Sequence, residues 1–345
     1  MSRPFALLSI LALHLFWACG APQQEGTPEV KETSASLPGD GASPAAQETE
    51  EQVETAPSVG DSLLGEALPP TRMARSQAEE FERALSEAQS DLEESPDSLD
   101  AWIWVGRRLG YLGRMREAIA HFTQALERFP NEPRLLRHRG HRYLSVRDLD
   151  RALLDLSTAA EKLEGKEDRV EQDGLPNAAG EPRSTLKGNV WYHLGLTHFV
   201  RGEHSRAYSA FSEALTLATN DDARVSSMYW ATLSLMRLEL YPDMAAVLAG
   251  LPAEPDVIEN QDYLTLVRLF RQEIPPEEVL QGSGLQFATL GFGVAQYHLG
   301  RTAIEFERAT QAETVDPNDI YLRILDESPW AAFGHLAAEA ELSRL

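Results

Sequence analysis

Apolar residues recur with the spacing of amphipathic helices over residues 99–220, and the pattern itself repeats. In the stretch WIWVGRRLGYLGRMREAIAHFTQALERFP, residues 102–130, bulky positions alternate with small ones such as Gly106. An equivalent glycine follows at Gly140, 34 residues later, and another at Gly195, after a further 55, which is one period plus 21. A fixed period of this length is typical of chains that stack helical repeats.

The offsets within one period resemble those of the tetratricopeptide repeat, in which each unit is a pair of antiparallel helices. Small residues remove bulk where the paired helices cross, while large residues fill the neighbouring gaps. The resemblance implies an all-α protein, a right-handed α-solenoid of antiparallel helix pairs whose first helices line a concave groove. It rests on these positions, copy by copy: Trp102, Gly106, Leu109, Gly113, Ala118, Phe122, Ala125 and Pro130; Leu136, Gly140, Tyr143, Ala152, Leu156 and Ala159; Trp191, Leu194, Gly195, Gly202, Ala207, Phe211 and Ala214.

The same pattern sets the predicted boundaries of the segments along the chain. An N-terminal helix or half-repeat is expected over 76–98, because Ala84 and Pro96 stand one period before their counterparts. The match decays after residue 221, so degenerate helix pairs and a C-terminal capping helix are expected over 222–345. Full repeats are predicted at 99–132, 133–164 and 188–221, and an insertion loop with turn residues at 165–187.

The N-terminus is typical of a secretory signal of the lipoprotein type. Residues 1–18 carry one arginine and then an uncharged apolar run too short to span a bilayer. Cys19 follows directly and is the chain's only cysteine. The residues before it resemble the cleavage box of bacterial lipoproteins, which implies a palmitate-type lipid anchor on Cys19. Gly20, in place of an aspartate, implies a cell-envelope location at the outer membrane, facing the periplasm. The alternative is a plain cleaved signal with an incidental cysteine.

Residues 19–75 are predicted to form a disordered, acidic tether. No aromatic residue occurs between 20 and 75, and the segment is rich in Pro, Ala and Glu. Such a composition buries too little apolar surface to offset the entropy of ordering the chain. The whole chain has a formal net charge of −23, which argues against nucleic acid as a partner.

Positive charge is concentrated in LLRHRGHRYL, residues 135–144, where five of ten residues are Arg or His. In the tetratricopeptide family the inward positions of the first helices bind peptides, and the resemblance transfers that role to this stretch and its equivalents. The groove is then expected to be basic and aromatic, and to bind a protein or peptide through an acidic segment or a C-terminal carboxylate. The candidate groove residues are Trp104, Arg107, Tyr111, Arg134, Arg137, His138, His141, Asn189, Tyr192 and His193.

Two accounts of this basic groove remain open. Either its arginines receive a carboxylate from a partner, or the chain neutralises them itself. Arg139 stands at an offset that is normally a buried leucine, so it must reach an acceptor, and the insertion is the nearest long segment able to supply one. The insertion is either a mobile surface loop or a lid over the basic end of the groove. The internal acids available are Asp148, Asp150, Asp155, Glu171 and Asp173.

Enzymatic chemistry finds no support in the sequence. It contains no HExxH, CxxC, GxSxG or phosphate-binding loop, and His138 and His141 lack a carboxylate at matching spacing. No catalytic residue, cofactor or metal is therefore predicted. The chain resembles an uncharacterised group of bacterial repeat lipoproteins, and we expect a non-catalytic scaffold that binds a protein segment in its groove. The alternative is a structural component or assembly factor of an outer-membrane or pilus-type complex, acting through its convex face or helix ends.

Overall fold

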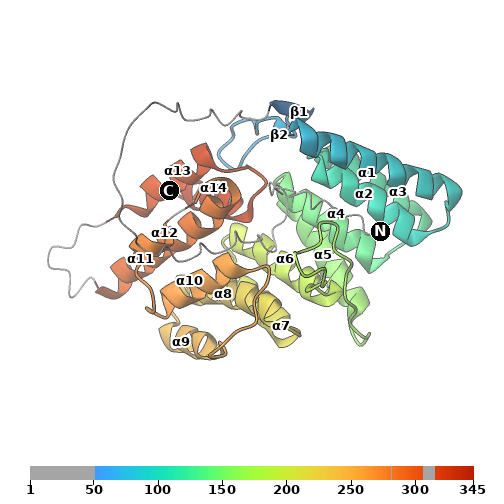
Figure 1. The fold of residues 1–345 in the computed structure, drawn as a ribbon. Coiled ribbons are helices and arrows are strands. Elements are labelled where there is room, and N and C mark those ends of the chain that lie inside the picture. The colour runs from blue at the N-terminus through green and yellow to red at the C-terminus, as the bar shows by residue number, and fades with distance from the viewer. Residues whose placement is uncertain (1–50, 281, 306–314) are drawn as a thin grey trace, which may run out of the picture.

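The computed structural model describes residues 51–280, 282–305 and 315–345, which form a stack of paired helices (Figure 1). The predicted signal peptide and Cys19 lie outside these residues. Each helix within them is too short or too polar to cross a membrane. Besides a hairpin of β1 (Gln52–Ala56) and β2 (Thr71–Ala74), the elements are α1 (Arg75–Glu94), α2 (Leu99–Tyr111), α3 (Met115–Arg128), α4 (Pro133–Ser145), α5 (Leu149–Leu163), α6 (Leu186–Val200), α7 (His204–Thr216), α8 (Asp221–Arg237), α9 (Tyr241–Ala249), α10 (Gln261–Phe270), α11 (Pro276–Val279), α12 (Gly284–Glu305), α13 (Pro317–Glu327) and α14 (Phe333–Leu342).

The predicted all-α solenoid of helix pairs is confirmed. Helices α2 and α4 begin at residues 99 and 133, 34 residues apart, and each packs against the helix that follows it. A third pair, α6 with α7, comes after the insertion. Side-chain caps fix where these helices begin. Ser98 Oγ accepts a hydrogen bond from the N–H of Ala101 at 3.3 Å, and Thr185 Oγ1 accepts one from that of Gly188 at 3.2 Å.

Close approach of the helices explains the small residues of the repeat. A Cβ atom on Gly106 would lie 2.3 Å from the ring of Phe122, and one on Gly195 would lie 2.7 Å from the ring of Phe211. Both rings are completely buried. A larger residue at either position would push a ring or a helix aside, so the glycine sets how closely the two helices of a pair can pack.

The prediction of a disordered tether up to residue 75 is wrong for its last part. Strand β1 pairs antiparallel with β2, and the loop between them buries Val59 and Leu68 against Trp330 and helix α3. Composition predicted disorder because the segment has few apolar residues of its own. The apolar surface that it covers comes from parts of the chain that are distant in sequence. The stretch 19–50 lies outside the described residues.

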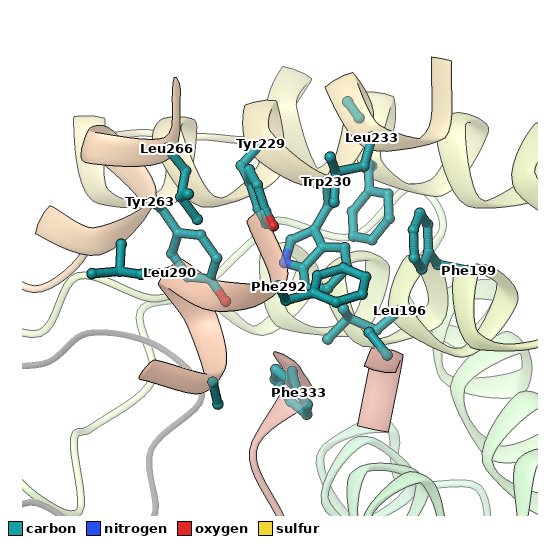
Figure 2. Close-up of a cluster of buried hydrophobic side chains, with 14 of the residues drawn as sticks. Leu196, Phe199, Tyr229, Trp230, Leu233, Tyr263, Leu266, Leu290, Phe292 and Phe333 are labelled. Carbon is teal, nitrogen blue, oxygen red and sulfur yellow. The ribbon is translucent and has the colours of Figure 1, made fainter. Parts of the chain in front are cut away.

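The C-terminal half, from α8 to α14, packs around an aromatic core. Figure 2 shows Trp230 beside Phe199 and Phe292, with ring centroids 5.2 and 5.8 Å apart. Helices α8 to α13 lie where degenerate helix pairs are expected. The last helix, α14, packs against α6, α12 and α13. Gly334 comes so near to α12 that a Cβ atom there would lie 2.0 Å from the carbonyl oxygen of Ala288, so the end of the chain is tightly seated.

Candidate functional site

The predicted groove residues come from the first helices of the three repeats, and α4 touches both α2 and α6. The chain itself covers the face that these helices present. Residues 171–175 of the insertion, which we name the groove segment, lie over α2 and α4 and are bound by their side chains. Helix α14 covers the neighbouring part formed by α4 and α6. The two covers use different chemistry.

The groove segment places a carboxylate among the basic residues. Glu171 Oε2 lies 3.2 Å from Arg137 Nη2 and accepts a hydrogen bond from Asn189 Nδ2, while Oε1 lies 3.8 Å from His138 Nε2. The side chains of Arg137 and Glu171 are only 9% and 10% exposed. Burial and the neighbouring arginines hold the pKa of His138 well below its ordinary value, so its ring is neutral. Arg137 therefore supplies the positive charge that neutralises the Glu171 carboxylate.

Two arginines of α2 hold the backbone of the groove segment. Arg107 Nη1 donates to the carbonyl oxygen of Gln172 at 2.7 Å, and Arg108 Nη1 donates to that of Gly174 at 3.1 Å. The guanidinium groups stack on one ring, at 4.4 and 5.0 Å from the centroid of Trp104. Cation–π contact of this kind orients a guanidinium without using its N–H donors. The predicted groove residues on α2 thus recognise peptide carbonyl groups.

Two residues at the end of the groove segment fit closely against α2. A Cβ atom on Gly174 would lie 1.9 Å from the hydroxyl oxygen of Tyr111, so only glycine allows the segment to approach this far. Tyr111 Oη in turn accepts a hydrogen bond from Arg107 Nη2 at 3.1 Å. Leu175 packs against the apolar cluster that contains the Tyr111 ring. Glycine and leucine therefore fill a position of defined shape beside the charged contacts.

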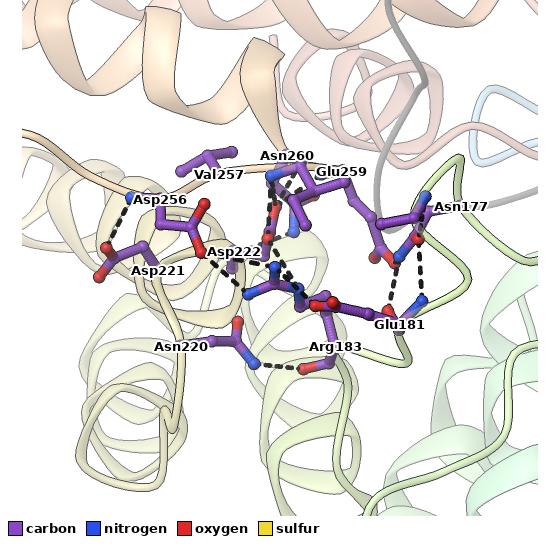
Figure 3. A network of polar contacts seen from close by, with 12 residues as sticks. Asn177, Glu181, Arg183, Asn220, Asp221, Asp222, Asp256, Val257, Glu259 and Asn260 are labelled. Atoms are coloured by element: carbon purple, nitrogen blue, oxygen red, sulfur yellow. Dashed lines mark hydrogen bonds and ion pairs between the residues drawn. The ribbon is translucent and has the colours of Figure 1, made fainter.

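The rest of the insertion is fastened to the start of α8 and to the loop before α10 (Figure 3). Asn177 Nδ2 donates to Glu259 Oε1, and Arg183 Nη1 lies 3.4 Å from Asp256 Oδ2. Asp222, on α8, accepts hydrogen bonds from the backbone N–H groups of Glu259 and Asn260 at 2.7 and 2.8 Å. We name this set the latch: Asn177, Arg183, Asp222, Asp256, Glu259 and Asn260.

Two carboxyl groups of the covered region are held in unfavourable surroundings. Burial raises the pKa of Asp173 to about 6, and Glu171 nearby adds to the effect while Arg107 opposes it. Both carboxyl oxygens of Asp173 are buried and lack a hydrogen-bond partner among the described residues. Burial likewise raises the pKa of Glu259 to about 7, against the hydrogen bond from Asn177. Near neutral pH these groups lose their protons at a cost to the folded state.

The remaining aromatic groove residues face α14 instead of the groove segment. The rings of His141 and His193 lie 4.3 Å apart, and both lie against Phe333, at 5.5 and 5.7 Å. Tyr192 belongs to the same cluster, with its hydroxyl oxygen 3.0 Å from that of Tyr263. The structure therefore brings His141, Tyr192 and His193 together, but as part of a core that the chain covers.

The predicted acceptor for Arg139 is wrong. Arg139 Nε and Nη2 donate to the two carboxylate oxygens of Asp155 at 2.7 and 2.8 Å, and the insertion does not take part. The reason is geometric, because this offset of α4 faces the second helix of its own pair, α5. Arg134, at the start of α4, pairs with the exposed Asp100. Internal neutralisation thus accounts for Arg139 through Asp155 and for Arg137 through Glu171.

Several residues of the site were not predicted. Arg108, Gly174 and Leu175 contribute contacts, and Phe333 covers the inner histidines. The turn-like sequence DGLP was a signal for a bend, but nothing local indicates that it lies on α2. Across the part of the chain that the structure describes, no cluster of three or more His, Cys, Asp or Glu side chains has the arrangement of a metal site. The geometry is that of a surface that holds a segment of its own chain.

No family model and no curated protein matches the chain. Among solved structures, YrrB, a TPR protein with an unusual peptide-binding site, has 14% identity and a TM-score of 0.41, covering 76% of this chain and 100% of that one. TTC0263, a thermophilic TPR protein in Thermus thermophilus, has 18% identity and a TM-score of 0.33, covering 49% and 91%. Naa15/Naa10 bound to HypK-THB has 15% identity and a TM-score of 0.34, covering 71% and 34%. Residues 99–216 form three antiparallel helix pairs, the first two 34 residues apart, and their groove is filled by the chain itself.

Proposed function

We propose that this protein is a non-catalytic scaffold that holds an extended, acidic segment of another protein in its concave groove. The supporting observation is the surroundings of Glu171, a buried carboxylate that pairs with Arg137 and accepts a hydrogen bond from Asn189, with the neutral His138 ring 3.8 Å away. Donors that bind the carbonyl groups of an extended segment do not depend on its side chains, so they suit a peptide from any chain. The groove therefore carries the charge and the donors that an acidic peptide needs.

Crosslinking in cells that produce the protein tests this function. We expect the wild type to form an adduct with a partner, and the double variant Arg107→Glu with Arg137→Glu to form none. The change makes both the donor to a peptide carbonyl group, Arg107, and the residue that pairs with a carboxylate, Arg137, negatively charged. Far-UV circular dichroism must show the same helix content for the variant. The matched control changes two exposed arginines outside the groove, Arg151→Glu with Arg206→Glu. An adduct that survives the groove variant, or is lost in the control, contradicts groove binding.

We also propose that Cys19 carries a lipid and anchors the protein at the outer membrane, facing the periplasm. The support is the signal pattern and its resemblance to a lipoprotein cleavage box. Labelling cells with a radioactive fatty acid should mark the wild type and leave Cys19→Ser unlabelled and in the soluble fraction. A Cys19→Ser protein that stays in the membrane fraction contradicts this anchor.

A second candidate function is assembly of an envelope complex through the convex face. It would use Leu154, on the second helix of its pair, α5, a leucine that is 67% exposed. Replacing Leu154 by aspartate should then abolish the crosslinked complex, while the Arg107→Glu and Arg137→Glu pair leaves it intact. The opposite outcome assigns the partner to the groove.

A further inference from the structure

We propose that the groove segment is an internal copy of the partner's binding segment, and that the protein is closed until a partner displaces it. This inference rests on the proposed function of the groove. It also names the partner's chemistry: a stretch without helix or strand that carries an acidic side chain, a glycine three residues later at a bend, and an apolar side chain directly after the glycine. The pattern is that of Glu171, Gly174 and Leu175. The groove contacts the side chains of Glu171 and Leu175, and it leaves no room for a side chain at Gly174.

The first argument is that the groove segment is held in the manner of a ligand. The insertion forms no helix and only one isolated bridge, between Val170 and Thr185. Its groove contacts are one carboxylate and two carbonyl groups bound by side chains of other helices. A segment that merely filled a core would meet apolar side chains over most of its length. Here Leu175 alone of residues 171–175 packs against an apolar cluster.

The second argument is that the insertion can leave without disturbing the repeats. At its base the N–H of Glu171 donates to the carbonyl oxygen of Ser184 at 3.0 Å, and that of Leu186 donates to Arg169 at 2.9 Å. These bonds hold the two ends of the insertion together beside α5 and α6. Residues 171–184 can therefore swing away as one loop once the Glu171–Ser184 bond and the latch contacts of Asn177 and Arg183 open, while the bond from Leu186 to Arg169 holds the base and the helices on either side keep their packing.

The third argument is that the closed state holds an unfavourable group that a partner need not have. The two carboxyl oxygens of Asp173 are buried without a hydrogen bond among the described residues, and the charged groups that act on them are Arg107 from α2, Glu171 from its own segment and Glu259 from the loop before α10. A partner segment with an uncharged residue at this position keeps the contacts of Glu171 and avoids the buried acid. Such a partner segment makes the same kinds of contact as the insertion without burying an acid, so its displacement of the insertion is favourable.

The test uses a labelled peptide with the sequence of residues 169–176, RVEQDGLP, and fluorescence anisotropy. The open variant has residues 171–184 replaced by a four-residue Gly-Ser linker, which the paired residues Val170 and Thr185 allow. We expect the peptide to bind the open variant at least tenfold more tightly than the intact protein. Its Glu171→Gln version should bind the open variant about tenfold more weakly. Adding Arg137→Gln to the open variant should remove the difference between the two peptides.

A second variant keeps the test decisive if the open variant does not fold. Glu171→Gln in the full chain weakens the hold of the groove segment and leaves the stem and the latch in place. We expect it to raise peptide affinity severalfold over the intact protein, whereas the matched change Glu167→Gln, at an exposed position of the insertion, leaves affinity unchanged. Peptide affinity that is equal in the intact protein, in Glu171→Gln and in the open variant overturns the proposal.

The possible failures separate this inference from the proposed function. If the peptide binds the intact and the open protein equally, the groove is a peptide site but is not blocked, so only the closed state is overturned. If the folded open variant binds no peptide, both the inference and the groove function are overturned. If the open variant forms a dimer in size-exclusion chromatography with light scattering, a second copy of this chain occupies the groove. That result overturns the claim that the occupant is a segment of another protein.

Discussion

Two parts of one groove are covered by the same chain in different ways. Over α2 and α4 the cover is a segment without helix or strand, bound by charged and polar contacts at Glu171 and two backbone carbonyl groups. Over α6 and α8 the cover is α14 and α12, with Phe333 and Phe292 within the aromatic cluster around Trp230 and Tyr192. The first cover can be exchanged for another peptide, whereas removing the second would expose the core of the protein.

A pair of buried ion pairs makes the difference concrete. Arg147 and Glu339 are 3% and 1% exposed, and Glu339 also accepts the N–H of Leu63 at 3.1 Å, so three distant parts of the chain meet there. Arg137 and Glu171 form a similar pair, but one member lies on a loop that is tied down at its stem and by the latch. Arg147 lies in the short turn between the packed helices α4 and α5, whereas Glu171 lies on a long loop, so the same chemistry is structural in the first pair and available for exchange in the second.

The largest effect is expected at the structural pair. Glu339→Leu leaves Arg147 buried without its carboxylate, which typically costs about 3–5 kcal/mol of unfolding free energy. Urea denaturation followed by circular dichroism measures this loss. The double variant Arg147→Met with Glu339→Leu should be much closer to the wild type, because no unpaired charge remains. A single variant as stable as the wild type would contradict a structural role for the pair.

Acid should weaken the same region. The pKa of Glu339 is lowered to about 2 although burial opposes this, because His335 and Arg147 donate hydrogen bonds to the carboxylate. A lowered pKa gives stability that is fully present above the ordinary value of 4.5 and is lost as the pH falls toward 2. Unfolding free energy measured between pH 5 and pH 2 should fall less in the double variant than in the wild type.

The latch should respond to pH in the opposite direction. The pKa of Glu259 is raised from 4.5 to about 7, so unfolding free energy falls as the pH rises through this window and is constant above it. Glu259→Gln removes the dependence while keeping an acceptor for Asn177. We expect it to stabilise the protein by about 3 kcal/mol at pH 8 and by almost nothing at pH 4, from the free energy of about 1.4 kcal/mol per pKa unit. A variant that is less stable at pH 8 contradicts this picture of the latch.

Glu171→Gln should act on the groove segment alone. The hydrogen bonds of a charged group contribute about 1.5–3 kcal/mol, and glutamine keeps part of them, so local opening becomes easier by about 1 kcal/mol. Hydrogen exchange of the amides in residues 171–175 should therefore be about fivefold faster, while the amides of α5 and α6 keep their rates. Equal acceleration in the helices would show that the segment is part of the core and that the two covers do not differ.

Local pattern predicted the fold well but predicted contacts poorly. The repeat at Gly106 and Gly140 is visible in the sequence because each glycine meets a ring or a leucine of its own helix pair, a few turns away. The candidate groove residues on α2 and α4 follow from the same period. The order of residues 51–74 and the cover by α14 depend on Val59 and Trp330 meeting across most of the chain, and no periodic signal records such a contact.

The sequence predicted that positive charge gathers on α4, but it did not predict which acid pairs with which arginine. The sequence offered two classes of acid for the arginines of α4, and the structure uses both, with Asp155 on Arg139 and Glu171 on Arg137. The choice depends on which face of α4 each arginine occupies, a difference of two positions along one helix. Asp150 was also a candidate, but it pairs with Arg201 instead.

The smallest effect is expected at the edge of the groove, where Arg134 pairs with Asp100. The side chain of Asp100 is 66% exposed, and ion pairs at such positions contribute about 0–1 kcal/mol because water and salt screen them. Arg134→Gln should therefore leave unfolding free energy almost unchanged and peptide affinity within twofold of the wild type in physiological salt. Arg134 was predicted to be a groove residue like Arg137, so the two variants compare one charge at the rim with one inside. A large loss of peptide affinity in Arg134→Gln would mean that the ligand reaches beyond the groove segment's own contacts, toward the start of α4.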